Sequence, residues 1–174
     1  MNGLSDVDFR NYYENKHAPL ASSLLTIEGY ERNYVNSKLN PLYSSLGSIS
    51  IFQYQSMQSL EVVGKEMSSS AGDKLRNDEL EFMDVSKNYH VLTESDQLTK
   101  KEFKKKIFYP LKNYEDLNLL DAYDGLEKIS DNLLIEPNEI ISISEYGITQ
   151  GISLEILETL ISEHPRAIIA SCVN

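Results

Sequence analysis

The stretch Phe9-Arg-Asn-Tyr-Tyr-Glu-Asn-Lys-His-Ala-Pro-Leu20 puts a histidine on the apolar side of a predicted helix, two residues before a proline. Residues four apart lie on one face of an α-helix, so Phe9, Tyr13 and His17 form a single stripe. Pro19 disfavours helical geometry at the residue before it. We therefore expect the helix to break at His17, where the imidazole would line a cavity.

Hydrophobic periodicity around this stretch predicts an α+β chain. Helices are expected over residues 6–17, 19–25, 58–68, 72–83, 114–129 and 153–164. Strands are expected over residues 30–35, 49–55, 89–95, 103–109, 133–135, 140–146 and 167–173. Ser5 and Asp8 are spaced as a capping box at the first helix, and Ser153 is the expected N-cap of the last one.

The order of these elements indicates two ferredoxin-like units. Residues 99–174 are predicted as β-α-β-β-α-β, which makes an antiparallel sheet with both helices on one face. Residues 1–98 are predicted as α-β-β-α-β, the same order without its opening strand. That strand either lay upstream or is replaced by Ile140–Tyr146 or Ala167–Val173, because its loss would leave backbone groups of both neighbours unpaired.

Composition limits the classes of function. The 174 residues carry a net charge of −11, which argues against nucleic-acid binding, and Lys100–Lys106 is expected to be a solvated linker rather than a phosphate or membrane contact. No apolar run approaches the roughly 20 residues that span a bilayer, so no membrane partner is expected. The single cysteine, Cys172, fits a reducing cytoplasm.

Motifs of several common sites are absent from the sequence. The glycine patterns of dinucleotide and P-loop sites do not occur, nor does the Gly-x-Ser-x-Gly elbow of α/β-hydrolases. His90 and His164 do not join His17 in any spacing typical of a metal site. We therefore expect neither a metal nor a built-in cofactor.

Several segments of the first half resemble the EthD family of small ferredoxin-like proteins. They are Gly3-Leu-Ser-Asp-Val-Asp-Phe9, Tyr12-Tyr-Glu-Asn-Lys-His-Ala-Pro-Leu20, Gly29-Tyr-Glu-Arg-Asn-Tyr-Val35, Phe82-Met-Asp84 and Val91-Leu-Thr-Glu94. The resemblance covers residues 3 to about 97, slightly over half of the chain. The second half has no recognisable histidine motif, so we expect residues 99–174 to form a degenerate, structural unit.

The resemblance implies dimeric α/β barrels, in which two sheets pack face to face and each unit encloses an apolar cavity. The chain would then be a homodimer, or an intrachain pseudo-dimer of its two halves. It also implies an oxidoreductase of the monooxygenase type without a cofactor, acting on a hydrophobic, aromatic or polyketide-like molecule. Related folds also host isomerases, cyclases and decarboxylases, and a non-catalytic ligand-binding or scaffold protein is the third alternative.

His17 is the leading candidate for catalysis. A histidine, with an ordinary pKa of about 6.5, can give or take a proton at neutral pH. Tyr13 could orient the imidazole, or polarise a carbonyl and stabilise the resulting anion. Alternatively, His17 caps the helix end and packs between helix and sheet.

Five further residues could line a substrate pocket. Tyr30, Arg32 and Tyr34 alternate along one face of the predicted strand, and Phe52 and Tyr54 belong to the next strand. Aromatic walls with a few polar tips are typical of small-molecule pockets, and the guanidinium of Arg32 could bind a carboxylate or phenolate. In the alternative interpretation the tyrosines only stabilise the sheet, and Arg32 lies on its outer face.

Overall fold

The computed structural model describes residues 3–136 and 139–173, which divide into two compact units. Among the described residues, unit 1 comprises residues 3–32 and 45–88. Unit 2 comprises residues 33–44, 89–136 and 139–173. Strand β1 (Gly29–Val35) begins in unit 1, and its last three residues belong to unit 2.

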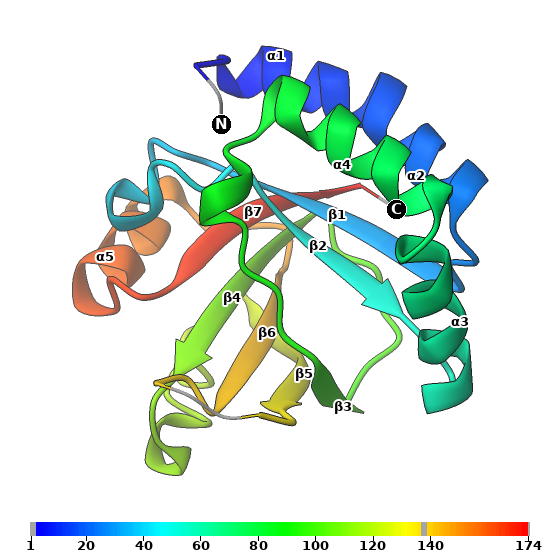
Figure 1. Cartoon of the computed structure of the whole chain (residues 1–174). Coiled ribbons are helices and arrows are strands. Elements are labelled where there is room, and N and C mark those ends of the chain that lie inside the picture. The colour runs from blue at the N-terminus through cyan, green and yellow to red at the C-terminus, as the bar shows by residue number, and fades with distance from the viewer. Residues whose placement is uncertain (1–2, 137–138, 174) are drawn as a thin grey trace. The chain divides into compact units, whose positions relative to one another are not determined.

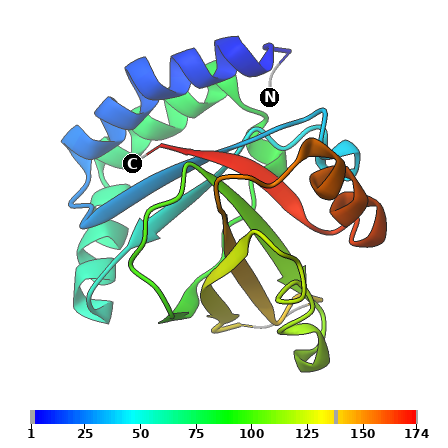
Figure 2. The same cartoon turned by 180° about the vertical axis from the view of Figure 1, so that it is seen from behind.

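Unit 1 is mostly helical. Its helices are α1 (Asp6–Tyr12), the π-helical turn η1 (Tyr13–His17), α2 (Ala18–Leu24), α3 (Met57–Met67), α4 (Ser70–Phe82) and the 3-10 turn η3 (Val85–Lys87). The predicted cap of α1 is confirmed, since Ser5 Oγ accepts a hydrogen bond of 3.2 Å from the backbone N–H of Asp8. Helices α1 and α2 follow each other end to end, and α4 lies alongside them in both views (Figures 1 and 2).

The predicted break before Pro19 is wrong. Ala18 has helical dihedral angles (φ −63°, ψ −43°), and the first helix runs into α2 through the π-helical turn η1. In this wider turn the N–H of Ala18 reaches back five residues to the carbonyl oxygen of Tyr13. Because the helix widens just before the proline, the ring is accommodated at the start of α2, where its missing N–H is tolerated.

The corner between α3 and α4 depends on a glycine. A Cβ atom on Gly72 would lie only 1.9 Å from the carbonyl oxygen of Met67, so a larger residue would force the two helices apart. The remaining strand of unit 1 is β2 (Ser48–Gln53), which lies beside β1. The predicted strands over residues 30–35 and 49–55 are therefore confirmed, although Tyr54 falls just after β2.

Unit 2 is built on an antiparallel sheet. Its elements are η2 (Pro41–Tyr43), β3 (Thr93–Gln97), β4 (Lys105–Leu111), η4 (Tyr114–Asp116), β5 (Leu126–Leu134), β6 (Ser142–Ile148), α5 (Leu154–Glu163) and β7 (Ile168–Val173). The strand order is β7-β4-β6-β5-β3 (Figure 1). The main core lies on one face, where Ile107 and Tyr146 of the sheet belong to the same buried cluster as Leu157 and Leu160 of α5.

The helix predicted over residues 114–129 is wrong. Only Tyr114–Asp116 forms a short 3-10 helix, turns follow it, and strand β5 begins at Leu126. The spacing of leucines matched a helical period, but turn-forming Asn, Asp and Gly residues interrupt it. Gly125 has a φ of +90°, which is a conformation that ends a helix rather than continuing it.

The strand predicted over residues 89–95 is only partly correct. Strand β3 begins at Thr93, and the chain from Tyr89 to Leu92 is irregular. Tyr89 is 68% exposed. The alternation of apolar residues there therefore reflects a surface segment and not a half-buried strand.

The α+β class is confirmed, and antiparallel strands with helices are compatible with a ferredoxin-like unit. However, residues 99–173 follow the order β4-β5-β6-α5-β7 instead of the predicted β-α-β-β-α-β. Two segments were candidates to replace the missing strand, and the C-terminal one lies next to β1. Strand β7 stands between the end of β1 and β4. The N–H of Asn36, just after β1, donates to the carbonyl oxygen of Ile169 in β7. Pairing into a barrel stays a prediction.

Candidate active site

His17 forms a buried pair with an aspartate of α4. Its side chain is 7% exposed, and its Nδ1 lies 2.9 Å from Oδ2 of Asp78, whose side chain is 6% exposed. Among the residues that the structure describes, His17 has a hydrogen-bond partner at Nδ1 and none at Nε2. The predicted catalytic residue is therefore held through one nitrogen, and Nε2 remains for other chemistry.

Asp78 is itself fixed by neighbours on the first helix. The hydroxyl group of Tyr12 donates to Oδ1 of Asp78 at 2.9 Å, and Lys16 Nζ donates to the Tyr12 oxygen at 2.6 Å. Lys16 Nζ also lies 3.9 Å from Oδ1. A buried carboxylate is stable only when such donors compensate for its lost hydration. Tyr12, Lys16 and His17 together supply this compensation.

Aromatic rings surround the imidazole. The ring centroid of Tyr13 lies 4.8 Å from that of His17 in an edge-to-face arrangement, and that of Phe82 lies 5.0 Å away. Phe9 contacts both of these aromatic rings. This packing lowers the local dielectric constant, which strengthens the hydrogen bond between His17 and Asp78.

The hydroxyl group of Tyr13 points into a separate hydrogen-bond chain. Tyr30 donates to the Tyr13 oxygen at 2.8 Å, and Tyr13 and Ser50 share a hydrogen bond of 2.7 Å. Burial raises the pKa of Tyr13 and that of Tyr30. Both phenols are therefore neutral at physiological pH. Tyr13 meets His17 through its ring, and Asp78 is the residue that orients the imidazole.

Three of the predicted pocket residues, Tyr30, Arg32 and Phe52, lie in or near this hydrogen-bond chain of unit 1. Arg32 binds Glu14 through Nε at 3.0 Å and Nη2 at 3.2 Å, and its side chain is only 13% exposed. The ring of Phe52 stacks on that of Tyr30 at 4.5 Å and is partly exposed. The fork of Arg32 is thus occupied by a carboxylate of the protein itself.

The other two predicted pocket residues lie elsewhere. Tyr54 follows β2 and is partly buried, and burial raises the pKa of its hydroxyl group. Tyr34 is buried, but it belongs to the part of β1 that is assigned to unit 2. The structure therefore brings Tyr13, His17, Tyr30, Arg32 and Phe52 together in unit 1, and assigns Tyr34 to the second unit.

Sequence reasoning missed Asp78, Ser50 and Glu14. A usable signal existed for Asp78, because Leu75, Asp78 and Phe82 are spaced three and four residues apart and all are buried on α4. A carboxylate on the apolar stripe of a helix indicates a buried partner. Ser50 and Glu14 carried no comparable signal.

The two other histidines lie in different surroundings. His90 is exposed, and His164 ends α5 with its ring against those of Tyr109 and Tyr123. Within residues 3–136 and 139–173, no group of three or more His, Cys, Asp or Glu side chains could hold a metal ion. In the same residues, every helix is too short or too polar to cross a bilayer.

Comparison with known proteins identifies the first part of the chain. The family model of the EthD domain matches residues 2–86. The EthD resemblance is confirmed. The match includes His17, Asp78 and all the residues of unit 1 that surround them, and it ends before strand β3. No curated protein and no solved structure matches the chain.

Proposed function

We propose that the EthD unit is a small cytoplasmic enzyme that abstracts a proton from a hydrophobic, aromatic or polyketide-like molecule, with His17 as the base. The observation that carries this proposal is the 2.9 Å hydrogen bond between His17 Nδ1 and buried Asp78. A carboxylate that accepts the Nδ1 proton selects the tautomer in which Nε2 is a proton acceptor. The same carboxylate stabilises the imidazolium ion formed when Nε2 takes a proton.

The proposed step leaves an electron pair on the substrate. The proton of a C–H bond beside a carbonyl group, or of a phenol, moves to Nε2, and the electrons of that bond stay behind as an enolate or phenolate. In the oxygenase version, this anion reduces O₂ and forms a carbon–oxygen bond, and the resulting peroxide anion takes the proton back from Nε2 to give a hydroperoxide. The reaction then needs no reductant besides the substrate.

The match to the EthD domain is the reason to prefer the oxidoreductase version. We also propose that the barrel forms in a homodimer or in an intrachain pseudo-dimer. An isomerase, cyclase or decarboxylase would use the same anion without oxygen. Tyr30 and Phe52, stacked at 4.5 Å with Phe52 partly exposed, are the aromatic wall that a planar substrate would contact.

Deuterium exchange tests the proton step without knowledge of the natural substrate. A panel of enolisable aromatic ketones and 1,3-diketones, such as 2-tetralone, is incubated with the protein in D₂O, and loss of the acidic C–H signal is followed by NMR. We expect exchange with the wild type and none above background with His17→Gln. His90→Gln, which changes an exposed histidine, is the matched control and should exchange normally.

An oxygen electrode with the same ketones separates the two enzymatic versions. Oxygen uptake that depends on His17 supports an oxygenase, and exchange without uptake supports an isomerase or cyclase. Equal exchange by the wild type and His17→Gln would contradict the role of His17 as the base.

The burial of His17 favours a second candidate, a non-catalytic ligand-binding or scaffold domain. A ring 7% exposed among aromatic side chains can serve as packing alone. In that case, no ketone of the panel would exchange, and replacement of His17 would change only the thermal stability.

A further inference from the structure

Unit 2 contains a pocket of which only one lining residue, Tyr43, lies within the EthD match. Its volume is about 350 Å³, and it is lined by Tyr43, Tyr89, Pro110, Lys112, Glu139, Ile140 and Arg166. A volume of this size lies within the range of pockets that hold small ligands. All seven lining residues belong to unit 2, and six of them lie beyond residue 86, where the EthD match ends.

The sheet explains why space opens here. Strand β4 pairs with β7 as far as Phe108 opposite Ile168, and Pro110 lies two residues beyond that last pair. Proline has no N–H group with which to continue such a ladder. On the other side of β4, pairing with β6 continues to Leu111, which brings Lys112 beside the start of β6. The pocket forms where β4 and β7 separate.

Arg166 is held at the edge of this opening by two acceptors. Its Nη2 lies 3.2 Å from Oδ2 of Asp116 and 3.4 Å from the hydroxyl oxygen of Tyr109, and the guanidinium lies 5.4 Å from the Tyr109 ring centroid. Both hydrogen bonds use Nη2. Among the described residues, Nε and Nη1 therefore remain to bind a ligand. Each of these two nitrogens can donate a charge-assisted hydrogen bond to an anion.

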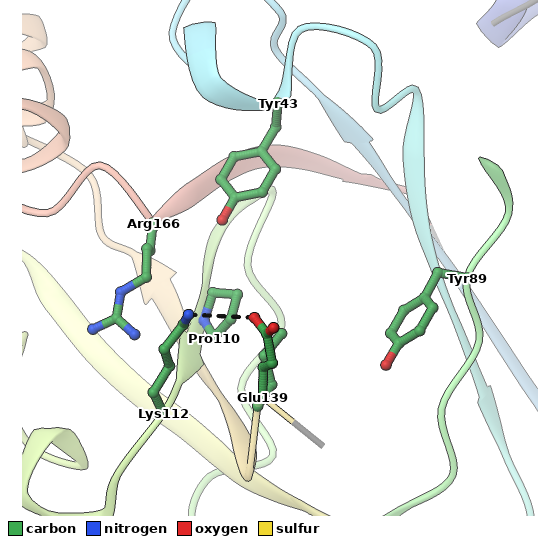
Figure 3. Close-up of a pocket in the computed structure, with 7 residues that line it drawn as sticks. Tyr43, Tyr89, Pro110, Lys112, Glu139 and Arg166 are labelled. Atoms are coloured by element: carbon green, nitrogen blue, oxygen red, sulfur yellow. Dashed lines mark ion pairs between the residues drawn. The ribbon is translucent and has the colours of Figure 1, made fainter. Parts of the chain in front are cut away.

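Lys112 supplies a second cation through a weak ion pair. Its Nζ lies 3.5 Å from Oε2 of Glu139, with side chains that are 56% and 88% exposed, so solvent screens the attraction. Figure 3 shows Lys112 and Glu139 reaching toward each other while the hydroxyl group of Tyr43 points toward the same space. An incoming anion can replace Glu139 as the partner of Lys112.

The walls of the pocket are apolar and aromatic. Tyr43 and Tyr89 supply aromatic rings, and Pro110 and Ile140 supply aliphatic surface. Tyr89 is 68% exposed, which is a large aromatic surface to leave in water. Lys112 and Arg166 bring two cationic side chains to this pocket, and an anionic ligand can take the place of Glu139 and share Arg166 with Asp116. We propose that this pocket binds a small planar aromatic carboxylate.

Isothermal titration calorimetry of the full chain with 2-naphthoate tests this proposal, with 2-naphthamide as the uncharged ligand of the same shape. We expect naphthoate to bind and naphthamide to bind at least about tenfold more weakly. Arg166→Gln should weaken naphthoate binding about 10- to 100-fold. Lys101→Gln, which changes an exposed lysine of unit 2 paired with Glu127, should not change it.

Glu139→Gln keeps the test decisive if Arg166→Gln fails to fold. Because it removes the carboxylate that competes for Lys112, it should tighten naphthoate binding about two- to threefold, an effect that structural damage does not produce. Absence of naphthoate binding, equal binding of the amide, or unchanged affinity in a folded Arg166→Gln variant would overturn the proposal.

Discussion

Each unit of this protein contains a buried pair of a basic and an acidic side chain, and these two pairs differ in chemistry. In unit 1, His17 lies 2.9 Å from Asp78, with side chains that are 7% and 6% exposed. In unit 2, Lys106 of β4 lies 2.7 Å from Glu145 of β6, with both side chains 7% exposed. Ser130 also donates to Glu145 at 3.2 Å. Burial and distance are nearly the same in both.

The difference lies in what each base can do after pairing. A lysine ammonium beside a carboxylate is a full ion pair, and here it joins two adjacent strands of the sheet. An imidazole can be neutral while it donates from Nδ1, which leaves Nε2 able to take a second proton. The pair of unit 2 therefore stabilises the sheet, and the pair of unit 1 can also transfer protons.

The largest expected effect on stability is in unit 2. Lys106→Ala leaves Glu145 as an uncompensated buried charge, which should cost about 3–5 kcal/mol in the free energy of unfolding measured with urea. The double variant Lys106→Met, Glu145→Leu should recover most of this loss, because an apolar pair has no charge to desolvate. A loss under about 1 kcal/mol for Lys106→Ala would show that the pair is not buried in solution.

Asp78→Ala should have a smaller effect, about 1–3 kcal/mol, because it leaves a buried imidazole N–H and a tyrosine hydroxyl group without their acceptor. Urea denaturation measures this loss, and Asp78→Asn, which keeps an acceptor oxygen, should lose less. If Asp78→Ala were as damaging as Lys106→Ala, the two pairs would be energetically equivalent and the comparison would fail.

Alkaline pH should destabilise both units through buried tyrosines. Burial raises the pKa of Tyr13 in unit 1 and of Tyr146 in unit 2, so each folded state holds its proton more tightly than the unfolded chain. The stabilisation is complete below the unfolded pKa of about 10 and is lost as the pH rises above it.

Thermal melts between pH 8 and pH 11 measure this decline. Tyr146→Phe and Tyr13→Phe should each reduce the slope above pH 10 and cost about 1 kcal/mol at neutral pH through the lost hydrogen bonds to Asp121 and Ser50. An unchanged slope in both variants would mean that neither phenol is buried in solution.

The helix caps should give the smallest effects and should be similar in both units. Ser5 Oγ and Ser153 Oγ each accept a hydrogen bond of 3.2 Å from a backbone N–H of the first turn. Ser5→Ala and Ser153→Ala should each cost about 0.5–1 kcal/mol in urea denaturation. Ser5→Thr and Ser153→Thr are the matched controls. Each keeps a hydroxyl acceptor at the cap and should retain most of the stability.

The sequence predicted local features better than pairings. Caps such as Ser5 and Ser153, and strands such as β1 and β7, depend on neighbouring residues and were found from short patterns. The helix predicted over residues 114–129 does not form, because the turn residues ending at Gly125 override the helical spacing of the leucines. A π-helical turn such as Tyr13–His17 has no sequence pattern of its own, so the sequence alone does not show how the helix continues through Pro19.

The candidate site was predicted only in its local part. His17 and Tyr13 lie four residues apart, but Asp78 lies 61 residues from His17 and reaches it only through packing of α4. Likewise, the pocket of unit 2 combines residues from Tyr43 to Arg166, whose proximity depends on how β4, β6 and β7 pair. Such contacts cannot be found from spacing along the chain.

Nitrogen-15 NMR of the imidazole of His17 tests the central claim most directly, with the signal assigned by its loss in His17→Gln. When the ring is neutral, the claim predicts a proton on Nδ1, shared with Asp78, and an unprotonated Nε2 that can act as a base. In Asp78→Asn this preference should weaken or reverse. A neutral ring protonated on Nε2 in the wild-type protein would contradict the proposed role of His17.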